Sequence, residues 1–195
     1  MAEVAAENVN PSPGAVVLVE GISDRIAVET LAARRGRDLD SDGVSILAIG
    51  GAQAIARSLN RFGPRGLGLK LAGLCDEGEE AEFRRGLERA GIGSGLDRPE
   101  MERLRFYVCV ADLEDELIRS LGADWVEEVV AARGDLGPFR TLQRQPEWRG
   151  RPKHEQLHRF MGSGGRRKTR YARFLVEALD PNRIPRPLNR LLAHV

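Results

Sequence analysis

Carboxylate side chains gather in this sequence where short apolar runs end. Three such runs are each followed by an acidic group: Glu20 with Asp24, Asp76 with Glu77, and Asp112 with Glu114. A fourth run is followed by Gly50-Gly51, a pair that lets another group approach the backbone closely. If the runs are parallel strands, their carboxyl ends share one edge of a sheet, where open α/β sheets bind ligands. The sequence therefore predicts an acidic cleft at that edge.

Carboxylates crowded in this way repel one another unless a cation lies among them. Oxygen-only ligation selects a hard cation such as Mg²⁺ or Mn²⁺, and Mg²⁺ commonly completes its shell with waters and substrate phosphate oxygens. Such a centre supports phosphodiester cleavage or phosphoryl transfer. The alternative is structural, because acids at helix N-termini also favour the helix dipole. Taken alone, Asp24 and Glu79 fit that alternative, whereas Glu20 directly follows a strand, ahead of the residues expected to cap the helix.

Strands and helices alternate along the first half of the chain. The apolar runs predict strands at 15–19, 44–49, 69–75 and 104–110, and the segments 24–35, 52–62 and 79–90 have helical character. Ser23 or Asp24 is the expected N-cap of the first helix. Strands that alternate with helices of this length are typical of βαβ units with right-handed crossovers. We therefore predict an α/β fold with a four-stranded parallel sheet flanked by helices.

The remainder of the chain is helical and basic. Helices are expected at 113–121, 123–133, 152–161 and 167–179, with an irregular link at 138–150 and a short terminal helix. Between Arg144 and Arg173 ten lysines and arginines stand against two glutamates. Residues 1–14 contain Asn-Pro-Ser-Pro-Gly and no periodicity, which predicts a flexible arm. The chain thus divides into an arm (1–14), an α/β core (15–112) and a helical basic C-terminal extension (113–195) packed on the core.

Composition excludes several classes of protein. The chain has 195 residues, of which 42% are hydrophobic and 30% charged, as in soluble globular proteins. No apolar run approaches the roughly 18 residues of a membrane helix, and the first ten residues do not resemble a secretory signal. Cys75 and Cys109 are too few for a disulfide framework or a zinc site, and we interpret them as small buried hydrophobes. These features predict a cytoplasmic protein without a membrane partner.

The motifs, taken in order, resemble a Toprim domain, which topoisomerases, bacterial primases and nucleases of the overcoming-lysogenization-defect (OLD) family share. The resemblance rests on Glu20-Gly21-Ile-Ser-Asp24 after the first strand, Gly50-Gly51 after the second and Asp76 after the third. The Glu-Gly-x-Ser-Asp form is most similar to the OLD nucleases. Their C-terminal pattern is also present, as Asp112-Leu-Glu114, Lys168-Thr-Arg-Tyr-Ala172 and Ile184-Pro185. The resemblance covers roughly residues 15–190 and implies a Toprim, Rossmann-like fold.

The resemblance also implies roles for individual residues. Glu20 would act near the scissile phosphate as a metal ligand or as acid and base, Asp24 and Asp76 would bind metal, and Glu114 would complete a second metal position. Lys168 would offset negative charge that develops on the phosphate. The neighbouring Arg166, Arg167 and Arg170 are expected to contact nucleic-acid phosphates, since cations at a helix N-terminus oppose its dipole and favour a compensating anion.

Two departures from the family pattern bear on activity. Toprim domains usually carry Asp-x-Asp after the third strand, whereas this chain has Asp76-Glu77-Gly78, so Glu77 or Glu79 is the candidate substitute. Whether one metal or two are held stays open. OLD nucleases also join the Toprim domain to an ATPase, yet no Gly-x-x-x-x-Gly-Lys-Ser/Thr loop occurs in this sequence. An ATPase partner would therefore be a separate chain.

Two functional hypotheses follow. The first is a Mg²⁺- or Mn²⁺-dependent nuclease or related phosphotransferase that acts on nucleic acid, DNA in preference to RNA. The second is a catalytically degenerate Toprim module that binds nucleic acid or a partner ATPase. A nucleotide-binding switch is weaker, because no glycine-rich phosphate loop follows the first strand. His154 and His158 are four residues apart but lack the His-Glu-x-x-His pattern of zinc enzymes, so we interpret them as surface or phosphate-contact residues.

Overall fold

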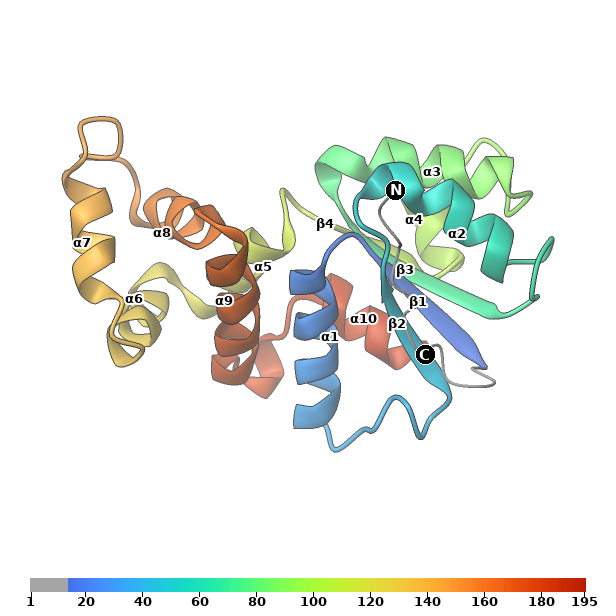
Figure 1. The fold of residues 1–195 in the computed structure, drawn as a ribbon, viewed down its shortest axis with the longest axis horizontal. Coiled ribbons are helices and arrows are strands. Elements are labelled where there is room, and N and C mark those ends of the chain that lie inside the picture. The colour runs from blue at the N-terminus through green and yellow to red at the C-terminus, as the bar shows by residue number, and fades with distance from the viewer. Residues whose placement is uncertain (1–13) are drawn as a thin grey trace, which may run out of the picture.

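A computed structural model describes residues 14–195 of the protein and shows one sheet of four parallel strands. The strands are β1 (Ala15–Val19), β2 (Val44–Ala48), β3 (Lys70–Asp76) and β4 (Phe106–Cys109), arranged in the order β2-β1-β3-β4 (Figure 1). The predicted α/β fold and parallel sheet are confirmed, although β4 is shorter at both ends than expected. The predicted N-terminal arm lies outside the described residues except for Gly14.

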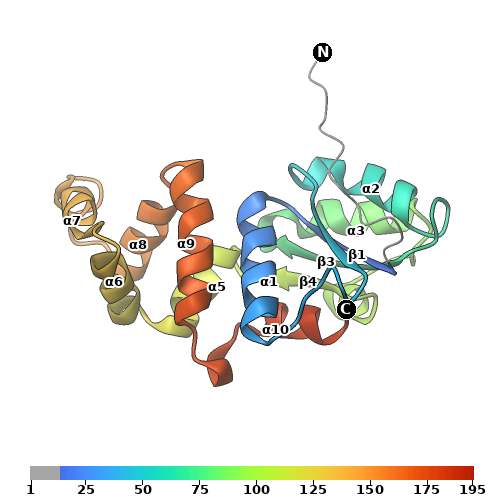
Figure 2. The ribbon, with the colours of Figure 1, turned by 60° about the horizontal axis from the view of Figure 1, so that its bottom comes forward.

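Helices cover both faces of the sheet, which explains the continuous apolar sequence of its strands. Helices α1 (Ile22–Arg34) and α10 (Arg186–Ala193) lie on one face, and α2 (Ile55–Phe62) and α3 (Glu80–Arg89) on the other (Figures 1 and 2). Every side chain of β1 is buried, with Val17 and Val19 in the core under α1 and the alternate residues in the core under α2 and α3. The fold therefore places the ends of β1 and β3 at the centre of the carboxyl edge.

Two helices are absent from the sequence-based prediction. Helix α4 (Arg98–Arg103) is short and begins with a capping box, in which Asp97 accepts from the Glu100 N–H and Glu100 accepts from the Asp97 N–H. Helix α7 (Leu136–Arg144) occupies half of the segment expected to be an irregular link. That expectation was wrong because Pro138 lies in the first turn of the helix, where its missing N–H has no intrahelical partner to lose.

The C-terminal helices form a bundle beside the α/β core. They are α5 (Leu113–Leu121), α6 (Ala123–Ala132), α7, α8 (Lys153–Gly162) and α9 (Gly165–Ala178). Helix α9 packs against α1, while α6 and α7 lie farthest from the sheet (Figures 1 and 2). Inside the bundle the ring of Phe160 meets those of Phe139 and Tyr171 edge to face, with centroids 5.3 and 6.1 Å apart. Single 3₁₀ turns occur at Ala52–Ala54, Glu77–Glu79 and Pro181–Arg183.

Arginines at the end of α1 hold the ends of two C-terminal helices. The Arg34 guanidinium donates to the carbonyl oxygens of Val176 (2.5 Å) and Leu179 (2.8 Å), at the end of α9. Arg37 donates to the carbonyls of Leu192 and Val195, both at 2.8 Å, at the end of α10. Because the last carbonyls of a helix lack intrahelical partners, these contacts tie the bundle and the last helix to α1.

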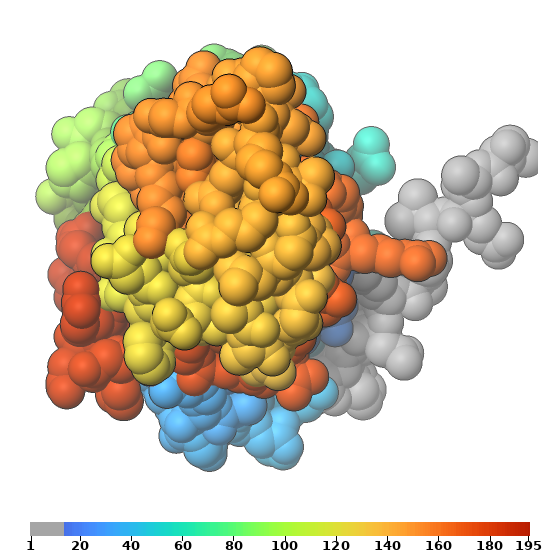
Figure 3. Space-filling model, turned by 90° about the vertical axis from the view of Figure 1, so that its left-hand side faces the viewer, coloured from blue at the N-terminus to red at the C-terminus, as the bar shows by residue number. Residues whose placement is uncertain are grey.

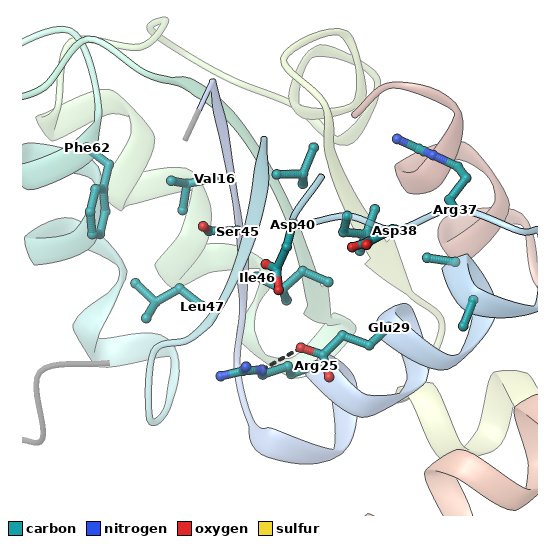
Figure 4. Close-up of a pocket in the computed structure, with 14 residues that line it drawn as sticks. Val16, Arg25, Glu29, Arg37, Asp38, Asp40, Ser45, Ile46, Leu47 and Phe62 are labelled. Atoms are coloured by element: carbon teal, nitrogen blue, oxygen red, sulfur yellow. Dashed lines mark hydrogen bonds and ion pairs between the residues drawn. The ribbon is translucent and has the colours of Figure 1, made fainter. Parts of the chain in front are cut away.

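The outer edge of β2, which pairs with no further strand among residues 14–195, borders a groove of about 490 Å³ (Figure 4). The groove is lined by β2 itself, by residues 37–40 and by one side of α1, where Arg25 Nε lies 2.7 Å from Glu29 Oε1. None of the carboxylates predicted as metal ligands lines this groove. The groove and the predicted acidic cleft are therefore separate features.

Two further expectations concern buried sulfur and the membrane. Cys75 and Cys109 are buried free thiols on opposite faces of the sheet, as expected of small buried hydrophobes, and burial raises the pKa of each. Within residues 14–195, every helix is too short or too polar to cross a bilayer.

Candidate metal centre

Glu20 and Asp76 meet where the neighbouring strands β1 and β3 end. Val19 of β1 pairs with Leu74 of β3, and Glu20 Oε1 accepts a hydrogen bond of 2.8 Å from the Asp76 backbone N–H. The backbone of Glu20 is held as well, because its carbonyl accepts from the N–H groups of Gly50 and Gly51, both at 3.0 Å. Both glycines have positive φ, at 77° and 111°, which this turn around Glu20 requires. The glycine pair therefore fixes a predicted metal ligand.

Asp24 lies in the first turn of α1, buried to 8% exposure. The helix begins at Ile22 with Gly21 as its N-cap, so the expectation that Ser23 or Asp24 caps it was wrong. Instead Asp24 Oδ2 accepts from the Gly21 N–H at 2.8 Å, because Asp24 is the third residue of the helix and reaches back to the cap. Asp24 also lies close enough to Glu20 for the two carboxylates to repel each other.

The segment after β4 brings two further carboxylates to the same edge. Ala111 adopts a left-handed backbone with φ 62° and accepts from the Glu77 N–H at 3.2 Å, so the β3 and β4 ends are joined. Asp112 then caps α5, accepting from the Asp115 N–H at 2.8 Å. Two residues later the side chain of Glu114 is only 4% exposed. The cap therefore fixes the turn of α5 that carries Glu114.

Glu114 pairs with Lys168 of α9, and one of its oxygens is left over. Lys168 Nζ lies 3.1 Å from Glu114 Oε2, whereas Glu114 Oε1 is buried without a hydrogen-bond partner among residues 14–195. Such buried, unsatisfied oxygens are uncommon in folded proteins and each calls for an explanation. The structure thus brings Lys168 into the acidic cluster, as the sequence resemblance implied.

Burial and mutual repulsion make this cluster hard to ionise fully. Burial, with repulsion from Glu20 and the other carboxylates, raises the pKa of Asp76 to about 8. Burial also raises the pKa values of Glu20, Asp24 and Glu114. For Lys168, burial acts to lower the pKa, but the attraction of Glu114 and the other acids outweighs it and the pKa is raised. The cluster is a strongly negative, partly protonated site with one built-in cation.

His158 is a contact that the sequence did not assign to this site. His158 Nε2 of α8 lies 2.6 Å from Asp112 Oδ2, and this hydrogen bond raises the pKa of the histidine. Burial acts to raise the pKa of Asp112, but the bonds from His158 and the Asp115 N–H outweigh it and the pKa is lowered. Forty-odd residues separate the two side chains, so only the packing of α8 against α5 brings them together.

The two candidate substitutes after β3 differ in their surroundings. Glu77 is exposed and lies 2.9 Å from the Arg98 guanidinium, which lowers its pKa. Glu79 is half-buried and contributes repulsion to Glu20. At Gly78 an added Cβ would have no heavy atom within 4 Å, and φ is not in the left-handed region. An aspartate there would therefore fit without strain.

The predicted phosphate-binding arginines differ in their contacts. Arg167 donates to the Phe160 carbonyl and to Ser163 Oγ, and Arg170 is paired with Asp135. Arg166 is exposed and has no ion pair among the described residues. Within residues 14–195, no three His, Cys, Asp or Glu side chains already converge tightly enough to hold a metal ion. The carboxylates therefore lie at one edge of the sheet without converging on a single metal position.

Comparisons with known proteins agree with this arrangement. The family model of the overcoming lysogenization defect protein-like TOPRIM domain matches residues 14–77. The solved C-terminal region of the Xanthomonas campestris pv. campestris OLD protein has a TM-score of 0.69 and 23% identity, over 94% of this chain and 92% of that chain. That of the Burkholderia pseudomallei OLD protein has a TM-score of 0.67 and 18% identity, over 93% of this chain and 96% of that chain. No curated protein matches.

The four-stranded parallel sheet with its flanking helices is the fold of the solved OLD C-terminal regions. Residues 14–77, which carry Glu20, Asp24 and Asp76, are the part of the chain that is similar to the OLD-like TOPRIM domain. The solved structures show that the rest of the chain, including the helical bundle, shares the fold of the OLD C-terminal region.

Proposed function

We propose that this protein is a nuclease or related phosphotransferase that uses Mg²⁺ or Mn²⁺ to act on nucleic-acid phosphodiesters, with DNA as the preferred substrate. An OLD-like Toprim domain suggests a nuclease-type function. The observation that carries the proposal is Glu114 Oε1, a buried carboxylate oxygen without a partner among the described residues. It stands in a cluster where Glu20, Asp24 and Asp76 raise one another's proton affinity.

The residues of the cluster fit a hard divalent cation. All candidate donors are carboxylate oxygens, the ligand type that Mg²⁺ and Mn²⁺ prefer. A bound cation would give Glu114 Oε1 a partner and would offset the repulsion that raises the pKa values. Glu20, Asp24 and Asp76 would hold one cation, and Glu114 a second. Such a cation polarises the phosphodiester and activates water for attack.

The chain's own residues supply the remaining parts. Glu20 is held rigidly by its contacts with Asp76 and with the glycine pair, so its carboxylate keeps a fixed place at the strand end. Lys168 forms an ion pair with Glu114, and its ammonium group would offset negative charge on a bound phosphate. Arg166, in the first turn of α9, adds an exposed cation beside Lys168.

The second candidate is a binding module without catalysis. It is favoured by Gly78, which removes a carboxylate from the end of β3, and by the engagement of Glu77 with Arg98. Such a module would bind nucleic acid or a separate ATPase chain. The open space at Gly78 makes the two candidates separable, because an aspartate can be restored there.

The test incubates labelled single- and double-stranded DNA and RNA with the protein in Mg²⁺, Mn²⁺ or EDTA. Metal-dependent cutting that is lost in Glu20→Ala and Asp76→Asn, but kept in the control Glu77→Gln, supports the nuclease. Cutting that appears only in Gly78→Asp supports the degenerate module. Cutting in EDTA, or cutting that survives Glu20→Ala, contradicts a metal centre at this edge.

A further inference from the structure

Three arginines around Trp148 lack carboxylate partners. Arg144, Arg149 and Arg159 are exposed, and none forms an ion pair within residues 14–195. Most other arginines of the C-terminal bundle are neutralised, for example Arg140 by Glu127 and Arg173 by Glu177. Uncompensated cations that gather in one place form a site for an anion. We call this group, Arg144, Trp148, Arg149 and Arg159, the Trp148 surface.

The Trp148 surface is held rigidly. The Trp148 carbonyl accepts from Nε2 of Gln156, a buried side chain, at 2.8 Å, and the indole packs on the bundle core. The guanidinium of Arg159 lies over the indole ring at 5.9 Å from its centroid. Arg149 donates to the Arg144 carbonyl at 3.2 Å. The cations are thus ordered in advance, which lowers the entropic cost of binding an anion.

Local acids offset this surface only in part. The nearest glutamates in the sequence are Glu147 and Glu155; Glu155 is engaged with Arg151 at 3.3 Å, and the exposed Glu147 is one negative charge against the three unpaired arginines. Arg151 also lies near the indole, at 5.2 Å from its centroid, and donates to the Glu147 carbonyl at 2.9 Å. The three unpaired arginines therefore remain available to a ligand. The face that α6, α7 and α8 present is shown in Figure 3.

Helix α8 links this surface to the acidic cluster. In α8, Arg159 of the Trp148 surface comes directly after His158, whose ring contacts Asp112 at the carboxyl edge of the sheet. Helix α8 therefore carries a residue of the Trp148 surface next to a residue that contacts the acidic cluster.

We propose that the Trp148 surface binds the phosphodiester backbone of the nucleic acid substrate, away from the phosphate at the acidic cluster. This inference rests on the proposed function, but it concerns the binding of the nucleic acid rather than its cleavage. The chemistry that recognises the backbone is the guanidinium–phosphate contact, and the indole supplies a flat face that favours an exposed base.

The test measures binding in EDTA, where cleavage does not interfere. Fluorescence anisotropy is followed from low to moderate salt with labelled single-stranded DNA, duplex DNA and single-stranded RNA of about 20 nucleotides, longer than the roughly 4–16 nucleotides that one single-strand-binding fold covers. The variant is Arg149→Gln with Arg159→Gln. The matched control is Arg57→Gln with Arg89→Gln, which removes the same charge from exposed arginines of α2 and α3 on the other side of the sheet.

Loss of two phosphate contacts should reduce the slope of log affinity against log salt by about 1.4 for single strands and about 1.8 for duplex. We expect that reduction, with at least about tenfold weaker binding at low salt, in the Arg149/Arg159 variant alone. Equal losses in both pairs, no loss, or absence of binding by the wild type would each overturn the inference. Cleavage of the 20-mer in Mn²⁺ tests the proposed function separately.

Discussion

Replacement of Asp76 by asparagine should stabilise the metal-free protein while removing its capacity for metal. Burial and the surrounding carboxylates raise the pKa of Asp76 to about 8 from an ordinary 3.8. At pH 7 the folded chain therefore holds a proton on this side chain that the unfolded chain releases. Each pKa unit corresponds to about 1.4 kcal/mol, so the shift from 3.8 to about 8 makes ionisation in the fold cost at most about 6 kcal/mol. Solvent screening of this partly exposed group reduces the expected gain to about 1–3 kcal/mol.

The sign of the pH dependence follows from the same shift. A carboxyl whose folded-state pKa is raised favours the fold below its unfolded pKa and loses that contribution as pH rises through the folded value. The wild type should therefore lose stability between about pH 4 and pH 8, and Asp76→Asn should lose less. The advantage of the variant should be small at pH 4 and largest near pH 8.

The assay is urea unfolding in EDTA, followed by circular dichroism, at about pH 4.5, 7 and 8.5, which span the unfolded-state and folded-state pKa values of Asp76. In a parallel thermal unfolding experiment, a gain of about 1–3 kcal/mol corresponds to roughly 2–10 °C in melting temperature for a chain of this size. Asp38→Asn is the matched control, because Asp38 is exposed and its pKa is lowered by hydrogen bonds from Ser41, so no gain is expected. A variant that is less stable than the wild type at pH 8.5 would refute the reasoning.

Three other substitutions test single contacts. Lys168→Met leaves Glu114 buried without its cation and should cost about 1–3 kcal/mol, whereas the double variant with Glu114→Gln should recover most of it in thermal unfolding. His158→Phe should destabilise the protein most below about pH 6.5, and progressively less as pH rises through the raised pKa of His158. Denaturation at about pH 5.5 and 8.5 measures this, and a stability difference between variant and wild type that is the same at both pH values would contradict the Asp112 pairing. Arg34→Met removes two bonds to carbonyls at the end of α9 and should cost about 1–2 kcal/mol, more than Arg35→Met, whose contact with Asn189 is exposed; equal losses would argue against the helix clamp.

The sequence predicted the sheet and its acidic edge because both depend on local patterns. Runs such as Ala15–Val19 are buried on both sides and read as strands without ambiguity. Parallel strands then bring Glu20 and Asp76 to one edge whatever the details of packing. The same local logic failed at α7, where Pro138 was taken to exclude a helix although it lies in the first turn.

Contacts between distant segments could not be predicted in the same way. Periodicity shows that α5 and α9 are helices but not which turn of one faces the other. The family resemblance pointed to Glu114 and Lys168 separately, and only the structure shows that they form an ion pair. The contact of His158 with Asp112 had no local signal at all. Likewise Gly50-Gly51 indicated a close approach, but only the structure shows that the approaching group is the carbonyl of Glu20.

Binding of Mn²⁺ is the most direct test of a metal centre at the carboxyl edge of the sheet. Calorimetric titration at pH 8.5, above the raised pKa of Asp76, would be done with and without single-stranded DNA for the wild type, Glu20→Ala, Asp76→Asn and the control Glu77→Gln. At least one Mn²⁺ should bind the wild type and the control, more tightly with DNA present, and should be lost in the other two variants. No binding by the wild type, or binding that survives both substitutions, would contradict the account.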